Sequence, residues 1–326
     1  MMHIYFVSLG CDKNLVDSEK MLALLTKEGY ELTDEPEQAE IIVVNTCAFI
    51  HDAKQESIET LLELAEYKKT GNCKVLIASG CLAERYQDTI LEEMPEIDGV
   101  IGTTAYDDIA VVVKKALGGE HAALTKELDY LPVHLTDRVT SGMSHVGYLK
   151  ISEGCNKNCT YCIIPSMRGH YRSVPMEDLI EEAEKLAEKG IRELILVAQE
   201  TTLYGVDLYH EKKLPELLRR LSEIRDISWI RVLYCYPEEI TVELAQELRE
   251  NPKVCHYLDL PIQHCNDEVL KRMGRRTTKA ELIEKIKMLR KEIPDIALRT
   301  TLISGFPGET NEQHEECIEF VREMKF

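Results

Sequence analysis

The 326-residue sequence predicts an α/β protein in which a doubly wound parallel sheet is followed by a partial (β/α) barrel. Short runs of β-branched residues alternate with amphipathic stretches along most of the chain, which is typical of βαβ units. The alternation is interrupted once, between residues 118 and 145, by paired glycines and a mixed polar stretch. We therefore predict a first domain over residues 1–120, a linker over 121–142 and a barrel over 143–326.

The first domain is predicted to contain four parallel strands with helices between them. The strands are expected at residues 3–9, 40–45, 73–78 and 97–101. The stretches Asp17 to Glu28 and Asp52 to Lys69 place apolar residues at three- and four-residue spacing, as a helix on a sheet requires. Right-handed crossovers then give a doubly wound sheet.

Three cysteines follow strands of this domain. Cys11, Cys47 and Cys81 each stand at a β-to-α junction, and two of them follow a glycine that permits a tight turn. Because ligands of open α/β sheets bind outside the carboxyl ends of the strands, we expect these thiols to converge. Isolated cysteines are often only small buried hydrophobic residues, but three at equivalent junctions favour a metal site.

The second domain repeats the pattern of strand and helix. Its helices include Met176 to Lys189, Lys279 to Lys291 and Asn311 to Met324. Five strands are expected, at residues 146–151, 193–198, 229–234, 256–260 and 296–303. The loop after the first of these strands should lie at the carboxyl end of the barrel, where barrel enzymes keep their active sites.

That loop contains the spacing CxxxCxxC, formed by Cys155, Cys159 and Cys162. Three thiolates can hold a [4Fe-4S] cluster with one iron open to a substrate, whereas electron-carrying ferredoxins use four cysteines. Zinc is the alternative, but structural zinc sites usually pair two CxxC knuckles and a second knuckle is missing. The spacing therefore favours an iron–sulfur cluster.

Composition restricts partners and compartment. The chain has 58 acidic and 39 basic residues and a net charge of -19, which favours a basic protein partner over nucleic acid. Eleven cysteines without a signal peptide indicate a reducing compartment, so we expect a cytoplasmic protein that is not bound to a membrane. The remaining cysteines are interpreted as packing residues: Cys73, Cys235, Cys255, Cys265 and Cys317.

The CxxxCxxC loop, with Tyr161 before its last cysteine, resembles the radical S-adenosylmethionine (SAM) enzymes. With the three N-terminal cysteines, the whole chain resembles their methylthiotransferase family. The segments that carry this resemblance are Ser8 to Glu19, Ile151 to Cys155, Ile163 to Gly169 and Val197 to Thr202.

The resemblance implies a substrate. Members that modify tRNA adenosine typically read Gly-Cys-Gln-Met-Asn at the first cysteine and Pro-Tyr-Thr-Arg-Gly after the second triad. This chain reads Gly-Cys-Asp-Lys-Asn and Pro-Ser-Met-Arg-Gly at residues 10–14 and 165–169. The differences favour the branch that methylthiolates the β-carbon of an aspartate in small-subunit ribosomal protein S-twelve, with tRNA as the alternative.

The resemblance also implies the cofactors. Cys155, Cys159 and Cys162 would hold one [4Fe-4S] cluster, and Cys11, Cys47 and Cys81 a second that supplies sulfur. SAM would serve as radical source and as methyl donor, with electrons from a flavodoxin or ferredoxin and a separate source of sulfide. Such barrels usually have six strands and a C-terminal TRAM domain, so the chain is expected to be truncated.

Four residues of the barrel are candidates for binding SAM. Gln199 and Glu200 end the second strand, where radical enzymes hold the methionyl amino group. Arg299 is a candidate for the methionyl carboxylate, or for a salt bridge inside the barrel. Gly305 lies in a segment that resembles the family's adenosine loop.

Other residues of the barrel have weaker signals. Gln263 or His264 could touch ribose or substrate, although such a histidine is more often structural. The basic cluster of Lys271, Arg272, Arg275 and Arg276 is expected to be a solvated helix end.

The sequence is also compatible with two other functions. One is an iron–sulfur electron carrier, and the other is a radical enzyme whose N-terminal cysteines are only structural.

Overall fold

The computed structural model describes residues 2–132, 137–142 and 144–326. Residues 133–136 of the predicted linker and residue 143 at the predicted start of the barrel lie outside this described part. The chain forms two compact units. Unit 1 comprises residues 1–141 and 163–170, and unit 2 comprises residues 142–162 and 171–326. The short segment 163–170 therefore belongs to unit 1, although it lies within the sequence of unit 2. The domain limits derived from the sequence did not anticipate that residues 163–170 belong to unit 1.

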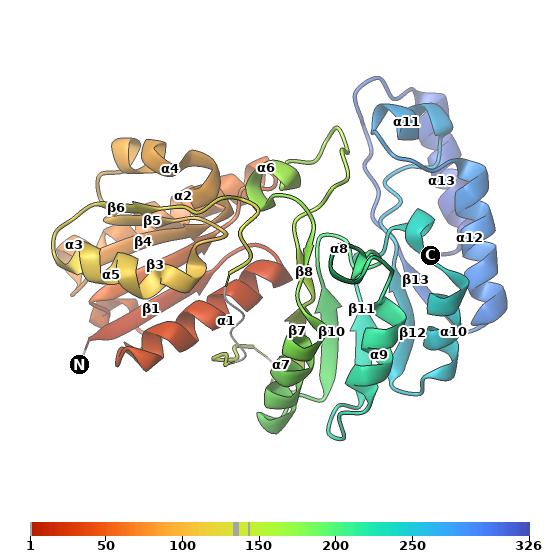
Figure 1. Cartoon of the computed structure of the whole chain (residues 1–326). Helices are drawn as coiled ribbons and strands as arrows, with labels where there is room; N and C mark the ends of the chain where they lie inside the picture. The colour runs from red at the N-terminus through yellow and green to blue at the C-terminus, as the bar shows by residue number, and fades with distance from the viewer. Residues whose placement is uncertain (1, 133–136, 143) are drawn as a thin grey trace. The chain divides into compact units, whose positions relative to one another are not determined.

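Unit 1 contains a parallel sheet in the strand order β2-β1-β3-β4-β5-β6 (Figure 1). Its strands are β1 (His3–Ser8), β2 (Glu31–Leu32), β3 (Ile41–Thr46), β4 (Val75–Gly80), β5 (Gly99–Ile101) and β6 (Ala122–Leu124). Every residue of β3 and β4 is buried, because parallel strands in the middle of such a sheet are covered on both faces. The predicted doubly wound sheet is confirmed, and β6 occupies the start of the segment predicted as a linker.

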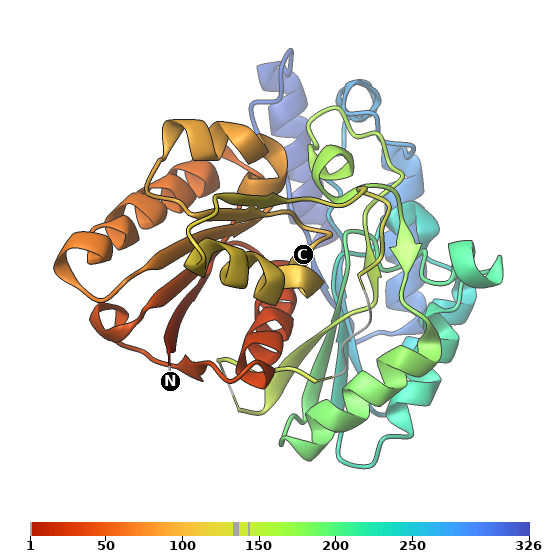
Figure 2. The ribbon, with the colours of Figure 1, turned by 60° about the vertical axis from the view of Figure 1, so that its left-hand side comes forward.

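Helices cover both faces of this sheet (Figure 2). On one face α1 and α5 pack through Met21, Leu25 and Val112, and on the other α2 and α4 pack through Leu61 and Leu82. The helical elements of unit 1 are α1 (Asp12–Lys27), η1 (Pro36–Gln38), α2 (His51–Ala65), α3 (Tyr67–Thr70), α4 (Cys81–Glu93), η2 (Tyr106–Asp108), α5 (Ile109–Leu117) and α6 (Ile164–Arg168).

The strand order creates a topological switch point in unit 1. Strand β1 pairs with β2 on one side and with β3 on the other, so the chain leaves β1 and β3 in opposite directions across the sheet. A crevice opens at such a point, outside the carboxyl ends of the two strands. Cys11 follows β1 and Cys47 follows β3, so the sheet itself places two of the predicted ligands there.

Unit 2 contains five parallel strands in sequential order, β7-β10-β11-β12-β13, as a partial barrel requires (Figure 1). The strands are β7 (Val146–Lys150), β10 (Glu193–Val197), β11 (Trp229–Val232), β12 (Val254–Asp259) and β13 (Ala297–Arg299). A short antiparallel pair, β8 (Ser152–Glu153) and β9 (Arg172–Ser173), follows β7. All five predicted strands are present.

One hydrophobic core joins the helices of unit 2 to its sheet. Helix α13 shows how the sequence builds it: Thr310 and Gln313 form a capping box at its start, and Cys317, Phe320 and Met324 bury one face. The helical elements are α7 (Met176–Glu188), α8 (Val206–Tyr209), α9 (Leu214–Ser222), η3 (Pro237–Glu239), α10 (Val242–Glu250), α11 (Asp267–Arg272), α12 (Lys279–Glu292) and α13 (Asn311–Met324).

Among the helices described, none is both long enough and apolar enough to cross a membrane.

Candidate functional site

Unit 1 brings the three N-terminal cysteines together at the carboxyl edge of its sheet. Cys11 directly precedes α1, Cys47 directly follows β3, and Cys81 is the first residue of α4. Cys11 is exposed, whereas the other two are buried. Burial raises the pKa of Cys47, and it raises the pKa of Cys81 to about 11; the nearby triad thiols add to both shifts. A group that binds thiolates must therefore supply positive charge, as a metal does.

Two glycines make room for this arrangement. At Gly80, with φ +87°, a Cβ would lie 2.2 Å from Asn45 Oδ1 and 2.6 Å from the carbonyl oxygen of Thr46. At Gly10, with φ +92°, a Cβ would lie 2.9 Å from the Cβ of Cys47. Only glycine combines these backbone conformations with such close neighbours. The glycines before Cys11 and Cys81 thus allow the strand ends to approach one another.

Two asparagines fix the loops that carry the thiols. The Asn14 side-chain amide donates hydrogen bonds to the carbonyl oxygens of Leu9 and Thr46, both at 3.0 Å. Asn45 in turn donates to the carbonyl oxygen of Asn14 and to Ser18 Oγ, both at 2.8 Å. Because all these groups are buried or half-buried, the bonds hold the ends of β1 and β3 in one geometry.

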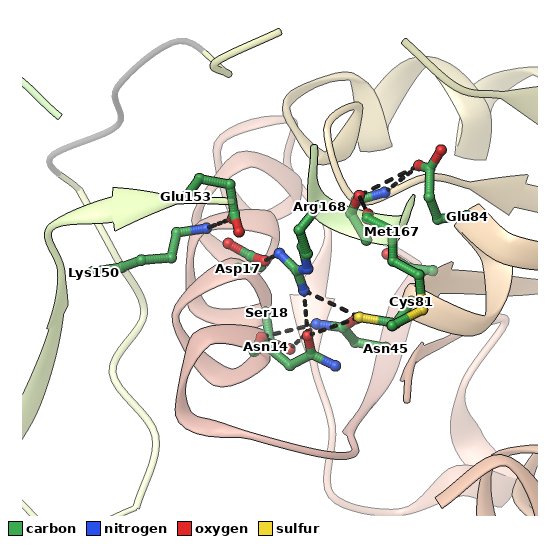
Figure 3. Close-up of polar contacts among 12 residues, drawn as sticks. Asn14, Asp17, Ser18, Asn45, Cys81, Glu84, Lys150, Glu153, Met167 and Arg168 are labelled. Atoms are coloured by element: carbon green, nitrogen blue, oxygen red, sulfur yellow. Dashed lines mark hydrogen bonds and ion pairs between the residues drawn. The ribbon is translucent and has the colours of Figure 1, made fainter. Parts of the chain in front are cut away.

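A buried arginine completes this cluster of polar contacts (Figure 3). Arg168 Nη1 donates to Asp17 Oδ2 at 2.9 Å, and its Nη2 donates to Asn14 Oδ1 and to Cys81 Sγ, the latter at 3.5 Å. The guanidinium charge opposes the effect of burial on the pKa of Cys81. Arg168 comes from α6, which packs on unit 1 through the buried Met167. It therefore stabilises negative charge on one thiol of the triad.

Sequence reasoning did not assign roles to Arg168, Asp17 or Asn14. All three lie in two of the four segments that carried the family resemblance, and that resemblance was the available signal. The contact between Arg168 and Asp17 spans 151 residues, so no local pattern could have predicted the pair.

Unit 2 contains the other triad in the loop after β8. Cys155 and Cys159 are buried and Cys162 is half-buried. Thr160 anchors the loop, since its N–H donates to the Met273 carbonyl oxygen at 3.0 Å and its hydroxyl to that of Arg272 at 2.9 Å. Gly274, with φ +70°, lies against the loop: a Cβ there would be 2.8 Å from the carbonyl oxygen of Asn158.

Polar groups surround these sulfur atoms. Burial raises the pKa of Cys155 to about 11, and the backbone N–H of Lys157, 3.4 Å from its sulfur, opposes the shift. The Cys159 sulfur lies 3.9 Å from the hydroxyl of Tyr236, and the Arg275 guanidinium lies over that ring at 4.3 Å. An N–H donor, a hydroxyl and a guanidinium that interacts electrostatically with Cys159 suit a cluster held by thiolates.

The interpretation of the basic cluster as a solvated helix end is wrong for Arg275. Its side chain is buried, and its Nη2 donates to the Pro261 carbonyl oxygen at 3.1 Å. Its position over Tyr236 explains the burial, because a guanidinium packs well on an aromatic face.

Two residues just beyond β10 present buried side-chain oxygen atoms. Gln199 Oε1 and Glu200 Oε2 have no hydrogen-bond partner within the part of the chain that the structure describes. Glu153, which pairs with Lys150 (Figure 3), accepts from the Gln199 amide at 2.6 Å and so orients it. Burial raises the pKa of Glu200 to about 7. Unpartnered buried acceptors are uncommon, so both oxygen atoms are candidates for contact with a ligand that carries donors.

Arg299 is the last residue of β13, and Gly305 lies in the loop that follows this strand. Arg299 Nη1 lies 2.7 Å from Asp259 Oδ1, so the salt bridge considered from the sequence is present. Four of the five guanidinium N–H donors remain for a second partner, and the side chain is 58% exposed. Gly305 has φ +76° and no heavy atom within 4 Å of a Cβ built on it, so open space adjoins its backbone.

Gln263 and His264 stand beyond β12. Gln263 forms an isolated bridge to Leu302, and His264 is buried and hydrogen-bonded to Glu309. The structural interpretation of His264 therefore agrees with its surroundings.

Two family descriptions match the chain. Residues 149–321 match the radical SAM superfamily, and residues 3–102 match uncharacterized protein family UPF0004. The first match contains Cys155, Cys159 and Cys162, and the second contains Cys11, Cys47 and Cys81.

Curated relatives match over nearly the whole chain. A protein of Lachnoclostridium phytofermentans named ribosomal protein uS12 methylthiotransferase RimO is 62% identical over 325 residues, covering 100% of this chain and 74% of its own. Proteins of the same name from Clostridium perfringens and Clostridioides difficile are 54% and 48% identical and cover 98% and 100% of this chain, with 72% and 73% of their own length matched.

Solved structures support the fold. The radical SAM methyltransferase TsrM from Kitasatospora setae, with cobalamin and a [4Fe-4S] cluster bound, has a TM-score of 0.70 at 15% identity and covers 100% of this chain and 74% of its own. The cobalamin-dependent radical enzyme OxsB has a TM-score of 0.66 at 13% identity and covers 98% of this chain and 52% of its own. At such identities the likeness concerns the fold alone.

Proposed function

The chain belongs to the RimO family of uS12 methylthiotransferases, and we propose that it adds a methylthio group to the β-carbon of an aspartate of that ribosomal protein. It is a radical SAM enzyme, which uses SAM and a [4Fe-4S] cluster. The observation that carries the proposal is the presence of two separate cysteine triads, each with its own polar surroundings, in one chain of this family. Neither an electron carrier nor a simple SAM-cleaving enzyme requires both.

Cys155, Cys159 and Cys162 are proposed to hold the radical SAM cluster. Two of these thiols are buried, and the Lys157 N–H and the Arg275 guanidinium act on them, which fits a thiolate-bound group. When bound, the cluster supplies the electron that cleaves SAM to a 5'-deoxyadenosyl radical. The protein's own task is to hold SAM and the target carbon in place and to exclude water.

Gln199 and Glu200 are proposed to bind the ammonium group of SAM. Their unpartnered oxygens are buried, so a ligand ammonium there would gain charge-assisted hydrogen bonds in a water-poor setting. A bound cation would also favour the ionised form of Glu200, whose pKa burial raises to about 7. Arg299 is proposed to meet the methionyl carboxylate while keeping its pair with Asp259, and the Gly305 backbone to approach the adenosine.

Cys11, Cys47 and Cys81 are proposed to hold a second [4Fe-4S] cluster, which supplies sulfur for transfer. The glycines that bring the strand ends together, and Arg168 beside Cys81, support this assignment. Arg168 offsets part of the negative charge that three thiolates bring into a buried site. Reaction further requires an electron donor of flavodoxin or ferredoxin type and a source of sulfide.

The experiment that tests the proposal offers both substrates at once. The natural full-length protein, with its iron–sulfur clusters reconstituted anaerobically, is incubated with SAM, sulfide, a reductant, uS12 and tRNA. The masses of uS12 and of the tRNA nucleosides are then measured by mass spectrometry. We expect a methylthio increment on one aspartate of uS12 and none on tRNA. An increment on tRNA alone would contradict the proposal.

A further inference from the structure

A third cysteine cluster lies in unit 2, apart from the CxxxCxxC triad in sequence. His264 and Cys265 follow β12, and Cys317 lies on α13. All three side chains are buried, and one ligand atom from each lies within 4.8 Å of the other two. Cys265 and Cys317 stand 52 positions apart, so no local sequence pattern places them together.

The two thiols lie close together. The Cys265 and Cys317 sulfur atoms are within 4.8 Å of each other. Cys265 is fully buried and Cys317 is 6% exposed. Two buried sulfur atoms beside an imidazole form the soft donor set that zinc prefers.

The imidazole is oriented by its neighbours. The backbone N–H of Asn266 donates to His264 Nδ1 at 3.0 Å, so that nitrogen is the acceptor and Nε2 carries the proton. Nε2 then donates to Glu309 Oε1 at 3.2 Å. The N–H that His264 donates to a carboxylate is the outer contact that metal-binding histidines usually make, and the Nδ1 lone pair, which here accepts from Asn266, is the one that a metal would take.

Glu309 is itself held in place. Its Oε2 accepts from the backbone N–H groups of Gly305 and Phe306, at 2.6 and 2.9 Å. Its side chain is 3% exposed. The carboxylate therefore connects the histidine to the loop of residues 304–309.

There is room for a fourth ligand. His264 and Cys317 line a pocket of about 330 Å³, together with Glu309 and His314. A water molecule fits such a space and would complete four-coordination.

We propose that His264, Cys265 and Cys317 bind one zinc ion, separate from the iron–sulfur triads. Binding releases the two thiol protons and uses the Nδ1 lone pair, so the Asn266 N–H gives up its hydrogen bond. The ion joins α13 to the segment after β12 and, through Glu309, to the 304–309 loop. Its role is to brace this part of unit 2.

The first test measures metal in the natural full-length protein with its iron–sulfur clusters reconstituted. After incubation with Zn²⁺ and dialysis, elemental analysis should find one zinc per chain in addition to the iron. Zinc-edge X-ray absorption should show two sulfur neighbours at about 2.3 Å and nitrogen or oxygen at about 2.0 Å. This measurement needs no variant, and the iron of the clusters does not contribute to the zinc edge.

Variants then assign the ligands. Cys317→Ser and Cys265→Ser should lose the zinc while keeping the iron content, whereas Cys255→Ser, on β12 and outside the cluster, should keep both. Glu309→Gln should weaken zinc binding roughly 10- to 100-fold, as loss of a carboxylate partner of a metal-bound histidine does.

Several results would overturn the proposal. These are a protein that binds no zinc, a zinc edge without sulfur neighbours, a zinc content unchanged by Cys317→Ser, or a Cys265–Cys317 disulfide found in the native protein by mass spectrometry. None of them bears on methylthio transfer, so the zinc site and the proposed function can fail independently.

Discussion

The two cysteine triads are built in opposite ways. The cysteines of unit 1 come from three strand ends spread over residues 11–81 and form a dispersed triad. The cysteines of unit 2 lie within residues 155–162 and form a local triad. The dispersed triad exists only when the sheet has formed, and it depends on Asn14, Asn45 and Arg168. The local triad is a single loop anchored to residues 272–274. The local triad can be recognised from its sequence motif, whereas the dispersed triad can be recognised only from the positions of its cysteines at the strand ends.

Removing a ligand of the local triad should have the largest effect. Cys159→Ala is expected to abolish SAM cleavage and methylthio transfer together, because the electron for cleavage is proposed to come through a cluster held by this triad. Iron content should fall by about four per chain. Chromatography of 5'-deoxyadenosine and iron analysis check the result, with Cys255→Ala as control. Retained cleavage would show that this triad is not the radical SAM site.

Arg168→Met tests what holds the dispersed triad together. It removes the buried ion pair of Arg168 with Asp17, so unit 1 should lose about 3–5 kcal/mol of unfolding free energy, as broken buried pairs do. Urea denaturation measures the loss, and adding Asp17→Asn should restore part of it.

The buried pair of Arg138 with Glu19 provides the control for Arg168. Arg138→Met should be similarly destabilising, but only Arg168→Met should shift the redox potential of the proposed unit 1 cluster, since Arg168 contacts Cys81. Equal redox potentials of the proposed cluster in the two variants would show that Arg168 does not act on it.

Glu200→Gln tests the proposed ammonium site of unit 2. Loss of the charged acceptor should weaken SAM binding roughly 10- to 100-fold, whereas Glu193→Gln, on β10, should not. In the parent protein SAM binding should weaken as pH falls through about 7, because the carboxylate becomes protonated. Calorimetric titration against pH measures both effects. If Glu200→Gln left the pH dependence of SAM binding unchanged, Glu200 would not be part of the SAM-binding site.

The same raised pKa has the opposite effect on the unliganded protein. The stability contributed by neutral Glu200 is fully present below its ordinary pKa of 4.5 and is lost as pH rises through about 7. Unfolding free energy measured without SAM should therefore decline over this interval, and less so in Glu200→Gln.

The smallest effect is expected at Gly305. Gly305→Ala meets no atom within 4 Å, so it should lower stability only by the cost of a left-handed conformation, about 1–2 kcal/mol. Gly80→Ala should cost more, because its Cβ would overlap Asn45 and Thr46. Equal thermal unfolding of the two variants would contradict the crowding described at the dispersed triad.

The sequence predicted the elements better than their contacts. The strands before Cys11 and Cys47 and helix α13 were predicted to within a residue or two, because burial and helical periodicity are local signals. Arg168 and the contact of Cys265 with Cys317 were missed. Both depend on packing between distant segments, which periodicity cannot report.

Arg275 shows the same limit. A run of basic residues usually indicates a solvated helix end, but the ring of Tyr236 provides a surface that buries one of them. No local pattern in the sequence places those two side chains together.

The two triads are proposed to have different tasks, and the variant Cys47→Ala separates SAM cleavage from methylthio transfer. The full-length variant is incubated anaerobically with SAM, a reductant, sulfide and uS12, and both 5'-deoxyadenosine and methylthiolated uS12 are measured. Cys73→Ala, a buried cysteine of unit 1 outside the triad, is the control. We predict that Cys47→Ala still cleaves SAM but transfers no methylthio group. Normal transfer by this variant would mean that the N-terminal cysteines are structural and would contradict the account.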